Sequence, residues 1–339
     1  MEEKTLAQRL VEAVQADFSD FDPGRRPVHT VGIGVRGRFA ASPVAAGFCI
    51  AAPFTQASVP VLVRFSNGSG SPVEHDGWSD VRGMATRFLL GEAGAMDMLA
   101  MTLPEFFAPD VEAFLQFSAA ARPRAVRREG AWAKLADMMR LELPLPDPYA
   151  GESVNGAAGM LDYANRHGSA RQAVAQAGMI GAPVSYARAT YHAVHCFRVT
   201  GAEGVCRPVR FNWQPVAGVR LTDPTTPPVD RYLHEELRAR LAAAPARFML
   251  MMTIGEVGDA LADPTRPWPA KRQRVVMGTL SLTAMVEDQQ EDCERVGFNP
   301  CRLVPGIAVS DDPVLQARRA AYEYSQALRG AATCPFAGG

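Results

Sequence analysis

The sequence predicts an α+β protein whose centre is a curved or closed antiparallel β-sheet with helices around it. A period-two pattern begins at residue 29, where apolar residues at 31, 33 and 35 alternate with glycine and arginine at 32, 34 and 36. Hairpin-type turn residues, Asn67-Gly68 and the segment 202–204, separate later runs of this kind. Glycines on one alternate face allow a sheet to bend and a ligand to approach closely, so these patterns favour a barrel.

Local periodicity predicts the individual elements in order. Leu6, Leu10, Val11 and Val14 recur at helical spacing and predict an amphipathic helix over residues 4–18. Further strands are expected at 59–66, 83–89, 190–200, 208–214 and 275–284, and further helices at 111–120, 130–141, 169–177, 229–243 and 313–329. Residues 121–185 form a helical insertion in this prediction. We expect residues 1–330 to form a single domain and residues 331–339 to be a flexible tail.

The composition is that of a globular protein with no general affinity for polyanions. The chain has 339 residues, 47% of them hydrophobic, and a formal net charge of −1, so binding to nucleic acid or to acidic membranes is not expected. The N-terminus is acidic and lacks the apolar stretch of a signal peptide, and no segment resembles a membrane span, so we expect the cytoplasm. The six cysteines lack metal-site spacing and are expected to be reduced thiols.

Near the C-terminus, Arg318 precedes Tyr322 by four residues within the last expected helix. Positions four apart share one face of a helix, so the guanidinium can lie beside the phenol and favour its ionised form. A phenolate is a hard, anionic ligand that stabilises ferric iron. A solvated arginine beside a packed tyrosine gives the same pattern, so the rest of the chain must decide between the two interpretations.

Five segments of the chain bear on that decision because of their sequence and their order. They are R-P-V-H-T-V-G at 26–32, V-R-F-S-N-G at 63–68, S-D-V-R-G-M-A-T-R-F at 79–88, D-M-L-A-M-T-L-P-E-F-F at 97–107, and F-N-P at 298–300 followed by P-G-I at 305–307 and L-Q-A-R-R-A-A-Y at 315–322. In this arrangement the chain resembles the catalase superfamily over about residues 20–330. It is most similar to the minimal catalase-related haem peroxidases, which have the catalase core without the C-terminal helical domain.

The resemblance implies a catalase-like antiparallel β-barrel, a C-terminal helix that carries the haem ligand, and haem b as cofactor. Tyr322 matches the metal ligand, and Arg318 matches the arginine beside it. His29 matches the distal histidine, which moves a proton during peroxide cleavage, and Ser66 matches the serine that orients this histidine. His195 matches a histidine near the haem.

The same resemblance assigns the remaining contacts to the cofactor. Arg26, Arg64 and Arg329 match the arginines that bind the two haem propionates, a task for which the guanidinium fork is well suited. Phe106 and Phe114 match aromatic residues that line or stack on the macrocycle. Taken singly, each phenylalanine could equally be a core residue.

Two departures from the family pattern concern the substrate side. Met101 stands where catalases have an asparagine that orients peroxide, and methionine cannot donate a hydrogen bond. Thr102 is therefore a candidate catalytic residue, provided that its hydroxyl points inward. Gly68 stands where the family has a valine that narrows the channel, so we expect a wider pocket that admits larger hydroperoxides or organic reductants.

These residues predict a haem peroxidase that reduces hydrogen peroxide or organic hydroperoxides with an unknown small-molecule donor, with weak or no catalase activity. One alternative is a fatty-acid hydroperoxide lyase or isomerase on the catalase fold, although Val28 replaces the threonine that this branch has before its histidine. A non-catalytic haem carrier or sensor is the other alternative. The resemblance leaves a homodimer open.

Overall fold

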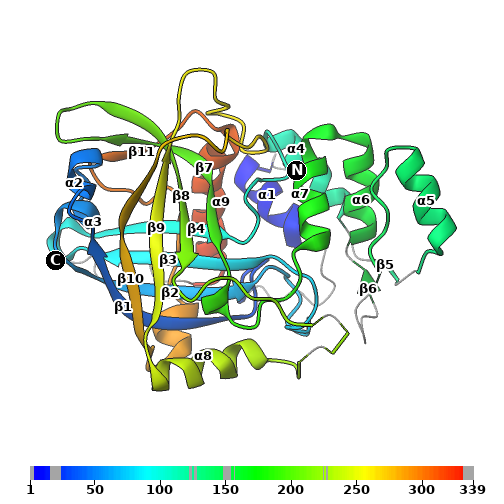
Figure 1. Cartoon of the computed structure of the whole chain (residues 1–339), viewed down its shortest axis with the longest axis horizontal. Coiled ribbons are helices and arrows are strands. Elements are labelled where there is room, and N and C mark those ends of the chain that lie inside the picture. Colours follow the sequence, from blue (N-terminus) through cyan, green and yellow to red (C-terminus); the bar gives the residue numbers. More distant parts are fainter. Residues whose placement is uncertain are drawn as a thin grey trace.

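The centre of the molecule is a closed barrel of eight antiparallel strands (Figure 1). The computed structural model describes residues 4–15, 24–121, 124–125, 128–147, 154–155, 157–223, 225–226 and 228–330. The barrel strands are β1 (Gly32–Ala41), β2 (Val59–Asn67), β3 (Arg82–Leu89), β4 (Ala95–Met101), β7 (Tyr191–Thr200), β8 (Cys206–Pro215), β9 (Ala246–Ile254) and β10 (Arg274–Met285). Their order is β7-β4-β3-β2-β1-β10-β9-β8, and pairing of β8 with β7 closes the ring. The predicted α+β fold with an antiparallel barrel is confirmed.

The barrel interior is a packed hydrophobic core. Phe65, Phe88, Trp213 and Phe248 are fully buried there, and Phe39 meets Phe88 edge to face with ring centroids 5.3 Å apart. Side chains alternate along each strand, so the neighbours of these core residues point outward. A ligand cavity therefore has to lie outside the barrel, against the outer face on which the glycine-rich positions fall.

Helices cover that outer face and one side of the barrel (Figure 1). They are α1 (Leu6–Gln15), α4 (Val111–Ala120), α5 (Ala131–Met139), α6 (Ala157–Arg166), α7 (Gly168–Met179), α8 (Tyr232–Ala243) and α9 (Pro313–Leu328). Two single-turn helices, α2 (Ala45–Phe48) and α3 (Ala52–Thr55), pack near β1 and β10. A short strand, β11 (Ile307–Val309), pairs with β7, and β5 (Arg124–Ala125) pairs with β6 (Val154–Asn155).

Two packing relationships position the site. Helix α1 packs against α9 and α4, which brings the two ends of the described chain together beside the barrel. A second hydrophobic cluster, which includes Phe117, Leu161, Tyr163 and Val174, joins α4, α6 and α7 into one helical layer. None of the helices in the described parts of the chain is long and apolar enough to cross a membrane.

The prediction and the structure differ at three barrel strands. Strand β1 begins at Gly32, so His29 precedes the strand instead of lying in it. Strands β4 and β9 were not expected from periodicity; β9 reads A-R-F-M-L-M-M-T-I, in which methionine and leucine give no β-branched signal. The predicted tail 331–339 and the end of the first predicted helix lie outside the described residues.

Candidate active site

A cavity of about 1870 Å³ lies between the outer face of the barrel, helix α9 and the helical layer. Its lining includes His29, Arg64, Phe106 and Tyr322, which are contributed by four distant parts of the sequence. This volume exceeds the usual range of pockets that hold a single small ligand, roughly 300–1,000 Å³. The cavity is therefore large enough for a bulky planar group and a second, smaller molecule.

His29 is held in an unusual backbone conformation at the edge of this cavity. Its φ is 55°, in the left-handed region that residues other than glycine rarely adopt. The conformation is maintained by β-like pairing with the segment after β2, because His29 N donates to Gly68 O at 3.1 Å and Thr30 N donates to Ser69 O at 3.2 Å. Strain retained in this way is typical of functional residues.

The hydrogen bonds of the His29 imidazole define its tautomer. Nδ1 lies 2.9 Å from Asn67 O, a carbonyl that can only accept, so Nδ1 carries the proton. Ser66 Oγ lies 3.0 Å from the same nitrogen. Nε2 is left as an unprotonated acceptor. Burial, followed by the charge of Arg64, lowers the pKa of His29 to about 4, so the ring is neutral at pH 7.

Gly83 leaves the space that this imidazole needs. A Cβ atom at residue 83 would lie 2.7 Å from Ser66 Oγ and 2.8 Å from His29 Nδ1, both too close for any side chain. Ser66, Gly83 and Met101 are direct cross-strand neighbours on β2, β3 and β4. The close packing of histidine on this glycine explains why the outer face of the sheet carries a small residue here.

A chain of four hydrogen-bonded side chains leads to Tyr322 on α9. Arg318 Nη2 donates to Tyr322 Oη at 2.7 Å, and the guanidinium carbon lies 5.2 Å from the centroid of the phenol ring. Arg318 Nη1 donates to His195 Nε2 at 2.8 Å. His195 Nδ1 in turn donates to Asp312 Oδ2 at 2.6 Å. The predicted one-face arrangement of Arg318 and Tyr322 is confirmed.

The sequence did not predict that His195 bonds Arg318, or that Asp312 bonds His195. Strand β7 carries two more residues than β8 between the pairs Ala193↔Phe211 and Phe197↔Val209. This bulge carries His195 to α9. A single-sequence pattern contains no signal for such a register shift, nor for the pairing of β7 with a helix more than 100 residues later.

The three arginines predicted to bind propionates meet at one end of the cavity. Arg26, Arg64 and Arg329 all line it, and Arg64 is almost fully buried. Arg64 and Ser66 point to the same side of β2, as predicted. Arg329 is the residue that follows α9, and its Nη1 donates to the backbone oxygen of Glu294 at 3.3 Å. The cluster brings three positive charges together in a partly buried place.

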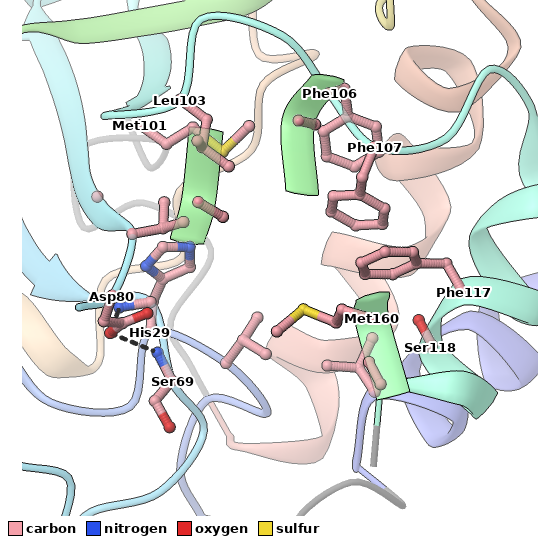
Figure 2. A pocket seen from close by; sticks show the side chains of 18 of the residues that line it. His29, Ser69, Asp80, Met101, Leu103, Phe106, Phe107, Phe117, Ser118 and Met160 are labelled. Atoms are coloured by element: carbon pink, nitrogen blue, oxygen red, sulfur yellow. Dashed lines mark hydrogen bonds between the residues drawn. The ribbon is translucent and has the colours of Figure 1, made fainter. Parts of the chain in front are cut away.

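Aromatic side chains form the wall that faces His29 (Figure 2). Phe106 and Phe114 lie nearly parallel with centroids 6.2 Å apart, and Phe107 stacks between Phe106 and Phe117 at 4.2 and 4.1 Å. Phe106 also lies 5.6 Å from the His195 ring. All four phenylalanines line the same cavity as Tyr322, so this wall is apolar.

The structure does not support the prediction that Thr102 is catalytic. Its hydroxyl oxygen accepts a hydrogen bond from Arg82 N at 2.9 Å, and its side chain is not among those that line the cavity in the described part of the chain. Neighbouring residues on a strand point to opposite faces, and Met101 is the one that points to the cavity. His192, the cross-strand neighbour of Met101, lines it as well.

The expected widening of the pocket at Gly68 is also not found. A Cβ atom there would lie 2.6 Å from Val81 O and 2.8 Å from Asp80 Oδ1, so the space of a side chain is already filled. The Asp80 carboxylate accepts hydrogen bonds from Gly68 N at 2.7 Å and Ser69 N at 3.1 Å (Figure 2). Glycine allows this carboxylate to approach the backbone at a position that itself lines the cavity.

Comparison with known proteins agrees with this architecture. Residues 10–227 and 247–334 match the catalase family. A protein of Mycolicibacterium paratuberculosis named catalase-related peroxidase is 33% identical over 91% of this chain and 90% of its own length. A catalase-related peroxidase of Synechococcus elongatus is 28% identical over 95% of this chain and 88% of its own length. Catalase-2 of Bacillus subtilis is 28% identical over 92% of this chain but only 45% of its own length. This chain is a member of the catalase family.

Proposed function

We propose that this chain is a haem b peroxidase, which reduces hydrogen peroxide or organic hydroperoxides with electrons from an external small-molecule donor. The observation that carries the proposal is the presence, in one cavity, of a neutral imidazole with a free Nε2 and of a tyrosine that Arg318 hydrogen-bonds. The peroxidase names of the two relatives that match most of the chain point the same way.

The residues present fit a haem group. The cavity can accommodate a macrocycle, and the aromatic wall supplies apolar contacts for it. Tyr322 would supply the oxygen that binds the iron, and Arg26, Arg64 and Arg329 would bind the propionates. Burial, followed by the charge of Arg64, lowers the pKa of Arg26 to about 9 and also lowers that of Arg329, so positive charge is only partly compensated in this cluster and anionic propionates would be favoured there.

Bound haem would supply the redox-active iron that receives the oxidising equivalents of the hydroperoxide. The chain supplies proton transfer. His29 Nε2 accepts the proton of the inner peroxide oxygen, and the same nitrogen returns it to the outer oxygen, which leaves as an alcohol or as water. Asn67 O and Ser66 Oγ keep the ring in the tautomer that this task requires. Two electrons from the donor and two protons complete the reduction, and the remaining oxygen atom leaves as water.

Met101 is the reason for proposing a peroxidase with little catalase activity. Dismutation needs a second peroxide molecule held near His29, and the Met101 side chain in that part of the cavity cannot donate a hydrogen bond. Reduction by an external donor has no such requirement. The cavity volume leaves room for an organic donor beside a macrocycle.

The other two functions fit less well. A hydroperoxide lyase or isomerase is not favoured by the peroxidase relatives, and a haem carrier would have no use for the strained His29 backbone and its bond to Asn67 O. We further propose that the protein is cytoplasmic. We also propose that it forms a homodimer, which sedimentation of the purified chain would test.

The test is to load the purified chain with hemin and to measure three activities. The first uses peroxide with a chromogenic donor, the second uses peroxide alone in an oxygen electrode, and the third uses a polyunsaturated hydroperoxide with product analysis by mass spectrometry. Donor oxidation with little oxygen release supports the proposal. A haem-loaded protein with the ferric spectrum of phenolate ligation that is inactive in all three assays would contradict it.

A further inference from the structure

The one carboxylate bonded to the arginine cluster, among the described residues, is that of Glu294. Its Oε1 accepts from Arg64 Nε at 2.8 Å and its Oε2 from Arg64 Nη2 at 3.2 Å, and Oε2 also forms a short ion pair with Arg26 Nη1. Through its backbone oxygen it accepts from Arg329 as well. All three arginines that line this end of the cavity are therefore bonded to a single residue.

Glu294 does not itself face the cavity. It is absent from the described residues that line it, whereas its three arginine partners are present. The carboxylate thus contacts the guanidiniums from behind and leaves their cavity side free. Within the described residues, Arg64 Nη1 and Arg329 Nη2 have no hydrogen bond to protein, whereas Arg64 Nη2 also donates to Thr30 O at 3.3 Å.

The backbone around Glu294 is fixed by β1. Glu294 ends a single π-helical turn (Gln290–Glu294), and the side chain of Gln289, the residue before that turn, bonds Gly34 N at 2.7 Å and Gly34 O at 3.0 Å. A Cβ atom at Gly34 would lie 2.6 Å from Cys293 Cβ, so only glycine allows the turn to pack so closely on the strand. The position of the carboxylate is therefore set before any ligand enters.

The charges of this cluster lead to a specific role. Three guanidiniums and one carboxylate leave two positive charges, the number that a dianion with two carboxylates neutralises. From this arrangement we propose that Glu294 is a positioning residue that keeps the three arginines folded in the haem-free protein and sets the charge of the site to match the two propionates. The inference rests on the proposed binding of haem.

A consequence distinguishes this role from plain structural support. Without Glu294, the haem-free protein holds three positive charges with no counter-charge, a loss that is strongly destabilising for partly buried ion pairs. Bound propionates would restore most of the balance. The stabilisation that haem provides should therefore be larger in a variant that lacks this carboxylate than in the wild-type protein, and this gain should depend on the propionate charge.

The experiment compares Glu294→Gln with the wild-type chain and with Asp292→Asn. Asp292 lies in the same turn, but its ion pair with Arg36 is solvent-exposed and away from the cavity, so its removal costs little. The melting temperature is measured without ligand, with hemin, and with hemin dimethyl ester, which has no propionate charge. We expect Glu294→Gln to lower the ligand-free melting temperature by on the order of 5 °C. Hemin should close at least half of the gap in melting temperature between Glu294→Gln and the wild-type chain, whereas the ester should leave this gap unchanged. Asp292→Asn and Glu294→Asp should stay closer to wild type.

Either of two results would overturn the role of Glu294. One is a ligand-free melting temperature of Glu294→Gln equal to that of the Asp292→Asn control. This result would mean that the arginines need no counter-charge. The other is a gap in melting temperature between Glu294→Gln and wild type that is the same with hemin as with its ester. This result would show that the propionates do not replace the charge of the carboxylate. Failure of the wild-type chain to take up hemin at all is a different result, because it would overturn the proposed function itself.

Discussion

Asp312 bonds His195 with one carboxylate oxygen and begins helix α9 with the other. Oδ2 accepts from His195 Nδ1 at 2.6 Å, while Oδ1 accepts from Val314 N and Leu315 N at 2.9 and 3.1 Å. The residue that caps the helix therefore also fixes the tautomer of the histidine, whose Nε2 must then accept from Arg318. The start of α9 and the hydrogen bond to Tyr322 are parts of one network.

Two substitutions at Asp312 separate the cap from the histidine contact. Asp312→Ala removes both, and we expect a loss of about 2–4 kcal/mol in unfolding free energy, from the missing cap and from a buried imidazole without its partner. Asp312→Asn keeps an acceptor for the helix N–H groups and should cost less than half as much. In hemin-loaded protein, the asparagine variant should still shift the charge-transfer bands of the ferric spectrum. Identical spectra would exclude His195 from the Tyr322 environment.

Replacement of Tyr322 by phenylalanine should abolish most haem binding. The change removes the oxygen that Arg318 bonds and leaves a ring of nearly the same volume, so the fold should persist. Tyr324→Phe is the matched control, because Tyr324 lies on the same helix and does not line the cavity. The measurement is the absorbance ratio of the Soret band to protein after reconstitution. Equal ratios in both variants would remove Tyr322 as the ligand.

His29→Ala should retain haem but lose peroxide reactivity by about 10²–10⁴-fold, the usual contribution of general acid–base catalysis. Ser66→Ala should lose about tenfold, because Asn67 O still fixes the tautomer. Stopped-flow mixing with hydrogen peroxide gives both rates. A His29→Ala protein that reacts at the wild-type rate would show that the proton moves through another group.

Met101→Asn should raise oxygen release from hydrogen peroxide by at least tenfold. The new amide can donate a hydrogen bond in the part of the cavity where methionine cannot, and the volumes of the two side chains are similar enough for the pocket to remain intact. Met101→Leu serves as the control, since it changes the shape without adding a donor. If the asparagine and leucine variants release the same amount of oxygen, dismutation is limited elsewhere.

Acid should destabilise the haem-free protein through His29. The pKa of His29 is about 4 in the folded protein against 6.5 for an exposed histidine, because of burial and the charge of Arg64. Between these values the unfolded chain binds a proton that the folded one does not, so stability is complete above pH 6.5 and falls as the pH drops toward 4. The full penalty is about 3 kcal/mol.

Urea unfolding at several pH values checks this sign. The wild-type chain should lose stability relative to His29→Gln by roughly 1.4 kcal/mol for each pH unit between 6.5 and 4. His192, whose pKa is also lowered to about 4 by burial, is present in both proteins and cancels in the comparison. A difference that does not vary with pH would contradict the protonation state assigned to His29.

Much of this site could be predicted from the sequence because its chemistry is local. Arg318 and Tyr322 are one helical turn apart, and Arg64 and Ser66 are one strand period apart, so in each pair the backbone alone places both side chains on one face. The alternation of strands likewise predicted a curved sheet or barrel with glycines on one of its two faces. Such relationships need no knowledge of what lies across the sheet.

Only the tertiary structure could decide the remaining features, because each depends on residues that are far apart in the chain. The left-handed backbone of His29 is held by the segment after β2, the bulge in β7 brings His195 to α9, and Glu294 meets Arg26 from 268 positions away. Sequence separation also explains the two expectations that the structure does not support. The backbone of Arg82 takes the Thr102 hydroxyl, and the backbone of Val81 and the carboxylate of Asp80 fill the space that a side chain at position 68 would need. Sequence patterns determined which groups are present and which face they share, whereas packing between distant segments determined their partners and protonation.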